Sequence, residues 1–215
     1  MKPCFNIDIK KFVDNISKYN MDFIRTWFTG YYKPNKVIDK LKDKPAPQWG
    51  FYATLLRAGF DSLLLYLPLA ILGRQPSTPS ALSFLPTEKY YWASVFLMPV
   101  YLILLWLLLS ATVHLILRFL KKNSGIDQIL NITGMVSLIV GAFLVPVDWL
   151  FILSGWKNPV MLGIVHMIIV IWGIVITVIG LKKILQTRIW LGIVLNIIWV
   201  IIGWGLSMIF IRPPV

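Results

Sequence analysis

The chain has 215 residues, of which 58% are hydrophobic and only 14% are charged, and its mean hydropathy is +0.75. Soluble domains are about 45–50% apolar and about 25% charged, so this composition excludes a soluble monomer. The formal net charge is +12. Because apolar runs separate the basic clusters, we attribute this charge to an anionic membrane surface and expect no nucleic-acid partner. The single cysteine, Cys4, excludes an intramolecular disulfide and a thiol-rich metal site.

Residues 1–49 are predicted to form a cytosolic or interfacial segment of amphipathic helix that binds anionic lipid surfaces. Its apolar residues recur at three- and four-residue steps, at Ile9, Phe12, Val13, Ile16, Phe23, Ile24 and Trp27. A helix that packs under the membrane bundle is the alternative. Gly30 ends this unit, and Pro34 can open a second short helix. The stretch 1–15 lacks an uninterrupted apolar core, so no cleavable signal peptide is predicted.

Residues 50–215 are predicted to form a transmembrane domain. Five apolar stretches each approach the ~20 residues needed to cross hydrocarbon about 30 Å thick. They cover approximately residues 50–72, 90–120, 126–153, 159–181 and 189–211. Arg57 and Asp61 stand four residues apart in the first span and are expected to pair on one helix face. The predicted fold class is therefore all-α: a polytopic membrane bundle of five transmembrane helices with an N-terminal amphipathic segment.

The basic residues alternate between the two ends of these spans. Eleven lysines and arginines lie before or at the start of the first span, and the following segments hold 2, 3, 1, 3 and 1. By the positive-inside rule, this alternation predicts a cytosolic N-terminus and an extracytosolic C-terminus. The expected location is the cytoplasmic membrane.

Small and polar residues form stripes on the last three spans. Association in lipid depends on close packing of small residues and on hydrogen bonds, so these stripes predict mutual contact among the three helices. The candidates for a packing or functional polar face are Asp127, Asn131, Asp148, His166, Gly173, Thr177, Asn196 and Gly203. His114 and Arg118 are candidates at the junction of the second and third spans.

Ionisable residues inside lipid raise a functional hypothesis by default. Asp148 and His166 are expected near the outer half of their spans, where they can meet. Such a pair can relay a proton, hold a metal or activate a nucleophile. We favour helix-to-helix hydrogen bonding, because the two histidines lie at opposite depths and a metal site needs three or four convergent ligands. No HExxH, GxSxG, phosphate loop or GxGxxG is present, so no catalytic residue, cofactor or metal is predicted.

The order of these features resembles the Yip family, the Ypt-interacting proteins. The run YYKPNKVIDKLKDKP at 31–45 is similar to the segment before the first span in prokaryotic members. The runs VHLILRFL at 113–120 and DQILNITG at 127–134 are similar to that family's junction between the second and third spans. Five spans with a cytosolic N-terminus are also that family's architecture, and the resemblance covers residues 31–211.

The resemblance implies a small integral membrane protein that is not an enzyme. Eukaryotic relatives act in endoplasmic reticulum and Golgi traffic, where they associate with one another and with prenylated Rab-type GTPases. Their DLYGP-type segment and long acidic N-terminal region are not found here, so Rab binding is not carried over, and the short basic N-terminus is similar to bacterial or archaeal members. The expected role is membrane organisation or partner binding, with homo- or hetero-oligomers as possible assemblies.

A small transporter or channel subunit is the competing interpretation, with its pathway along the polar faces of the last three spans. A membrane-embedded enzyme is the third. A cavity lined by His166, Asp148 and Asn196 would favour transport, whereas a filled bundle would favour binding or scaffolding.

Overall fold

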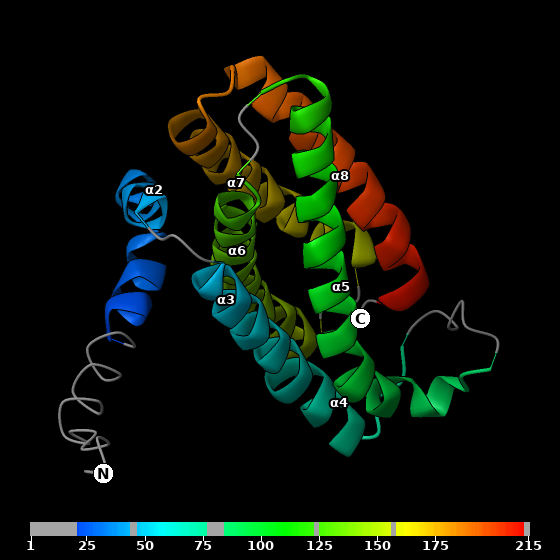
Figure 1. The fold of residues 1–215 in the computed structure, drawn as a ribbon. Coiled ribbons are helices and arrows are strands. Elements are labelled where there is room, and N and C mark those ends of the chain that lie inside the picture. The colour runs from blue at the N-terminus through cyan, green and yellow to red at the C-terminus, as the bar shows by residue number, and fades with distance from the viewer. Residues whose placement is uncertain (1–20, 44–46, 77–83, 123–124, 156–157, 213–215) are drawn as a thin grey trace, which may run out of the picture.

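The computed structural model describes residues 21–43, 47–76, 84–122, 125–155 and 158–212, and these are helical with short connections and contain no strand (Figure 1). Five helices are long and apolar enough to cross a membrane: Gln48–Ile71, Thr87–Phe119, Ile126–Ser154, Val160–Leu185 and Ile189–Met208. The all-α class and the bundle of five membrane-spanning helices are thereby confirmed.

The first span is built from three consecutive helical pieces. These are α3 (Gln48–Gly59), a π-helical segment η1 (Phe60–Tyr66) and α4 (Leu67–Ile71). The later spans are more regular. A 3₁₀ turn η2 (Thr87–Lys89) leads into α5 (Tyr90–Phe119), followed by α6 (Ile126–Ser154), α7 (Pro159–Leu185) and α8 (Ile189–Phe210).

Helix α6 is the central element of the bundle. It packs against α3, η1, α5 and α7, and against the short helix α2 (Pro34–Lys42) that precedes the first span. Helix α8 packs against α7 and α5 (Figure 1). The contacts predicted between the third and fourth and between the fourth and fifth spans are therefore present. The predicted packing of the third span on the fifth is not extensive, because α5 is the second neighbour of α8.

Helices α3 and α6 cross backbone to backbone at two glycines. A Cβ on Gly134 would lie 2.3 Å from the carbonyl oxygen of Gly50, and a Cβ on Gly50 would lie 2.1 Å from the carbonyl oxygen of Leu130. At the same crossing, the Gly50 N–H donates to Asn131 Oδ1 over 2.8 Å. The first N–H groups of a helix have no partner within it, and the N-cap residue here, Pro47, offers none. Asn131 therefore caps α3 from the neighbouring span.

The described part of the N-terminal segment packs against the bundle. Helix α2 buries its apolar face, Val37, Ile38 and Leu41, in the main core. Lys183 on α7 pairs with Asp39 over 2.8 Å. Residues 21–43 therefore contact the bundle, and the interfacial location of the segment stays a prediction. Residues 1–20, which hold Ile9, Phe12, Val13 and Ile16, lie outside the described part of the chain.

The two ends of the bundle differ in charge. We call the basic end the one where α5 and α7 finish and α6 and α8 begin, and its basic residues are Arg118, Lys121, Lys122, Lys182, Lys183 and Arg188. The described basic residues at the opposite end are Arg74, Lys89 and Arg212, with Glu88 beside them.

We expect Gly134→Ala to lower the thermal stability of the detergent-solubilised protein. The new methyl group would meet the Gly50 backbone, which cannot move aside as a flexible side chain can, and overpacking costs about 1–3 kcal/mol. Gly203→Ala is the matched control, because a Cβ there meets nothing within 4 Å. Thermal unfolding in one detergent compares the two variants, and equal unfolding temperatures would contradict the close crossing.

Candidate functional site

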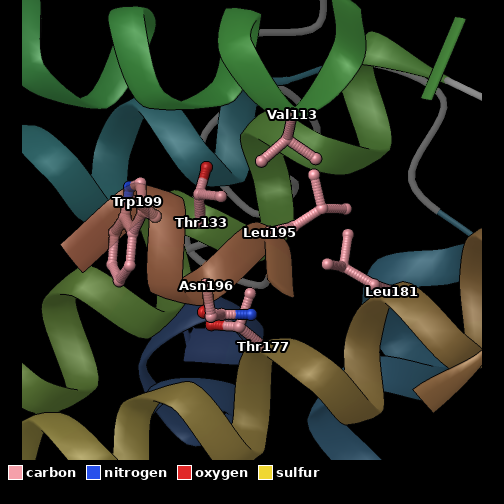
Figure 2. Close-up of a pocket in the computed structure, with 7 residues that line it drawn as sticks. All are labelled: Val113, Thr133, Thr177, Leu181, Leu195, Asn196 and Trp199. Atoms are coloured by element: carbon pink, nitrogen blue, oxygen red, sulfur yellow. The ribbon is translucent and has the colours of Figure 1, made fainter. Parts of the chain in front are cut away.

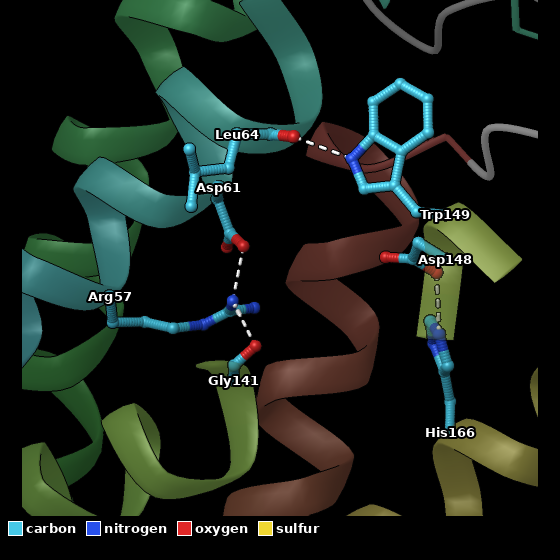
Figure 3. A network of polar contacts seen from close by, with 7 residues as sticks. All are labelled: Arg57, Asp61, Leu64, Gly141, Asp148, Trp149 and His166. Carbon is cyan, nitrogen blue, oxygen red and sulfur yellow. Dashed lines mark hydrogen bonds and ion pairs between the residues drawn. The ribbon is translucent and has the colours of Figure 1, made fainter. Parts of the chain in front are cut away.

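A buried ion pair lies inside the first span. Arg57 Nη1 donates to Asp61 Oδ1, one helical turn further along, and the two side chains are only 11% and 5% exposed. The same guanidinium nitrogen donates to the carbonyl oxygen of Gly141 on α6 over 2.7 Å (Figure 3). The predicted pairing of Arg57 with Asp61 is confirmed, and the arginine also links the first span to the third.

Gly141 provides the space through which this arginine crosses α6. A Cβ at position 141 would lie 1.7 Å from Arg57 Nε and 2.0 Å from its Cδ. Any side chain there would therefore displace Arg57 from Asp61. A glycine is needed at position 141 because the arginine occupies the place of a side chain there.

A second link between these helices satisfies a carbonyl group at the π-helical segment. In an α-helical register the carbonyl of Leu64 would accept from residue 68, which is a proline and has no N–H. Trp149 Nε1 on α6 instead donates to the Leu64 oxygen over 2.7 Å (Figure 3). This indole gives the Leu64 carbonyl a partner from the third span, one turn before Pro68, and an unpartnered carbonyl in hydrocarbon costs several kcal/mol.

Asp148 and His166 meet between α6 and α7. His166 Nε2 lies 2.9 Å from Asp148 Oδ1, and the side chains are 33% and 8% exposed (Figure 3). Both residues lie towards the opposite end of the bundle from the basic end, as expected from their positions in the spans. The contact links the two helices, and it also brings together the two groups that a proton relay would use.

The other predicted polar-face residues are distributed over several contacts. Gly173 packs on Val140, since a Cβ there would lie 2.6 Å from Val140 Cγ2. Thr177 and Asn196 are buried and donate to carbonyls of their own helices, Gly173 over 2.9 Å and Gly192 over 2.8 Å. Gly203 faces open space.

The candidates at the basic end lie apart from these contacts. Asp127 is half-buried in the first turn of α6, and near the end of α5 His114 is half-buried and Arg118 is exposed. The structure thus does not gather the predicted residues into one site.

A cavity of about 10 Å³ lies between α5, α6, α7 and α8 (Figure 2). Its lining residues are Val113, Thr133, Thr177, Leu181, Leu195, Asn196 and Trp199. A single water needs about 10–15 Å³, and pockets for small molecules measure about 300–1,000 Å³. A transport cavity is expected to be lined by His166, Asp148 and Asn196. Asn196 lines the cavity observed here, and Asp148 and His166 do not. It has no room for a solute larger than water.

Sequence reasoning missed the partners of these groups. The Arg57 bond to Gly141 and the Trp149 bond to Leu64 join residues more than eighty positions apart. A local signal existed for each, namely a glycine in a polar stripe and a proline inside an apolar span. Neither signal identifies the residue on another helix that makes the contact. Over the described residues, no group of three or more His, Cys, Asp or Glu side chains is placed to hold a metal ion.

Comparison with known proteins gives one match. A family model, described as Yip1 domain, matches residues 30–210. No curated protein and no solved structure matches the chain significantly.

We expect Arg57→Met to destabilise the protein strongly, because it leaves the Asp61 carboxylate buried without its cation. Breaking a buried pair from one side costs about 3–5 kcal/mol. The double variant Arg57→Met, Asp61→Leu removes both charges and should recover most of the loss. Thermal unfolding in detergent measures all variants, with Arg118→Met as the exposed-arginine control. A double variant as unstable as the single one would show that the buried carboxylate is not the cause.

Proposed function

The chain belongs to the Yip1 domain family, and on that premise we propose that this multi-pass membrane protein is a non-enzymatic organiser of its membrane or a scaffold that binds partner proteins. The family is not known for enzymatic activity, which supports this assignment. The five apolar spans make the lipid bilayer its surrounding medium.

The observation that carries the proposal is that the charged side chains Arg57, Asp61 and Asp148 inside the bundle are paired with other groups of the protein. Arg57 is shared between Asp61 and the Gly141 carbonyl, and Asp148 pairs with His166. A transport pathway needs polar groups that line a passage, and the cavity beside Thr177 and Asn196 admits one water at most. Transport along the polar faces of α6–α8 is the competing function, and the Asp148–His166 contact is the observation that favours it.

The charge difference between the two ends supports an orientation and a lipid preference. We place the basic end in the cytosol and the opposite end outside, in the cytoplasmic membrane, because basic residues are retained on the cytosolic side. Exposed lysines near an anionic surface contribute about 1 kcal/mol each, so this end favours anionic headgroups. Homo- or hetero-oligomers remain part of the proposal, since a scaffold acts through such contacts.

Replacing His166 separates the structural role from a chemical one. If His166 only bonds Asp148, His166→Gln should be mild, because an amide keeps a hydrogen-bonding group. A histidine that titrates near neutral pH cannot be replaced in this way. We would measure thermal stability in detergent and complementation of the deletion phenotype, with His114→Gln as the matched control. A His166→Gln protein that folds normally and alone fails to complement would favour transport or catalysis.

The orientation is tested with introduced cysteines. In a Cys4→Ser background, Lys122→Cys at the basic end should react with a membrane-impermeant thiol reagent only after the cells are opened. Arg74→Cys at the opposite end should react in intact cells, because both positions are exposed in the structure. The reverse pattern would invert the proposed orientation.

A further inference from the structure

Residues 21–42 form a helical hairpin that precedes the first span. Residues 21–29 are one helical arm, Gly30 to Lys33 make the turn, and α2 is the returning arm. Lys40 on α2 pairs with Asp22 on the first arm and donates to Thr26 Oγ1 over 3.2 Å. The two arms are therefore connected to each other, and α2 is also connected to the bundle.

The turn of the hairpin lies beside the middle of the membrane spans. A Cβ on Gly30 would lie 2.3 Å from Ile139 Cδ1, in the middle of α6. The Tyr31 ring stacks on Trp172 of α7 with centroids 6.0 Å apart, and it lies 6.4 Å from the Phe143 ring. Trp172 precedes Lys182 by ten residues, which is about 15 Å along a helix that rises 1.5 Å per residue. The turn thus lies about half a bilayer below the basic end.

On both arms, the residues farthest from the turn lie at the basic end. On the first arm, Phe23 packs edge-on against Trp49, at the start of α3, with ring centroids 5.5 Å apart. On the returning arm, Asp39 pairs with Lys183, the basic residue near the end of α7. The chain therefore descends beside the spans, turns at Gly30 and returns to the same end.

The N–H groups of the turn have partners within the protein. The N–H groups of Gly30, Tyr31, Tyr32 and Lys33 all donate to carbonyls of the preceding turn, over 2.8–3.2 Å. The next residue, Pro34, has no N–H. The Trp27 indole N–H donates to the Tyr31 hydroxyl over 3.2 Å. Lipid gives no partner to a free N–H, so a turn inside a bilayer must be satisfied in this way.

The first arm has a second apolar face that the described residues leave exposed. Phe23 and Trp27 pack on the bundle, whereas an outward stripe with helical spacing consists of Met21, Ile24, Phe28 and Tyr32. Phe28 is 54% exposed and Tyr32 is 67% exposed. The stripe adjoins Phe143, which is half exposed on the outer surface of α6 and contacts Tyr31. It is therefore continuous with surface that faces acyl chains.

We propose that residues 21–42 are a re-entrant hairpin that enters only the leaflet at the basic end and exposes Met21, Ile24, Phe28 and Tyr32 to acyl chains. The returning arm is too short to cross the membrane, since about 20 residues are needed and α2 has 9. Arg25 is exposed on the first arm, and its long stem can carry the charge towards the headgroups. In the turn, the Lys33 ammonium lies 5.6 Å from the centre of the Tyr32 ring. This inference does not depend on the scaffold role.

The experiment measures the depth of single nitroxide labels in the full chain. In a Cys4→Ser background, labels are placed at Met21→Cys, Phe28→Cys and Tyr32→Cys, and the protein is reconstituted at low density in phosphatidylcholine–phosphatidylglycerol vesicles. Electron paramagnetic resonance power saturation gives the accessibility of each label to oxygen, which concentrates in lipid, and to a water-soluble nickel chelate. Leu104→Cys, exposed in the middle of α5, is the lipid control, and Lys122→Cys is the water control.

The proposal requires that labels at Phe28 and Tyr32 give the same ratio of oxygen to nickel accessibility as the lipid control at Leu104. The label at Met21, nearer the basic end, should give a lower ratio. Ratios equal to that of Lys122 would place the hairpin in water and overturn the proposal. Low accessibility to both reagents would also overturn it, because protein would then cover the stripe. In that case, broadening of the spectrum by a dipolar interaction between labels on two chains would identify the covering protein as a second copy of the chain.

Discussion

A backbone or side-chain polar group that lies in hydrocarbon must find its partner within the protein, and this constraint explains the contacts around α6. The Asn131 amide oxygen accepts from the free N–H at the start of α3. The Trp149 indole donates to the carbonyl of Leu64, one turn before Pro68, and the Gly141 carbonyl accepts from Arg57. All three contacts connect α6 with the first span. The central helix therefore provides hydrogen-bond partners to the most irregular of the five spans.

The irregularity of the first span follows from its sequence. It contains an arginine, an aspartate and a proline within twelve residues, and hydrocarbon alone would accommodate none of them. The π-helical segment between α3 and α4 holds Asp61 in a buried position beside Arg57. The glycines of α6 allow the close approach, because Gly134 admits the α3 backbone and Gly141 admits the Arg57 side chain. The two helices are thus matched residue by residue.

The sequence was sufficient for the class of fold and the five spans, because hydropathy and length alone identify membrane helices. It also predicted the local Arg57–Asp61 pair, since residues four apart share a helix face. Long-range partners were beyond it. A stripe of small residues marks a helix face that can pack closely, but it does not show whether another helix packs there. Gly173 has Val140 against it, whereas Gly163 and Gly203 have no atom near the place of a Cβ.

The same distinction between hydropathy and packing applies at the start of the membrane domain. Hydropathy separates residues 34–42 from the spans, because lysines alternate there with apolar residues. Packing joins them, since Val37, Ile38 and Leu41 are at most 1% exposed and lie in one core with α6 and α7. The family match begins at residue 30, in the turn of the hairpin, and so includes the returning arm with the five spans. The core therefore includes α2, which hydropathy alone would place in water. The lysines on one face of this helix lower its mean hydropathy, although its other face is apolar and buried.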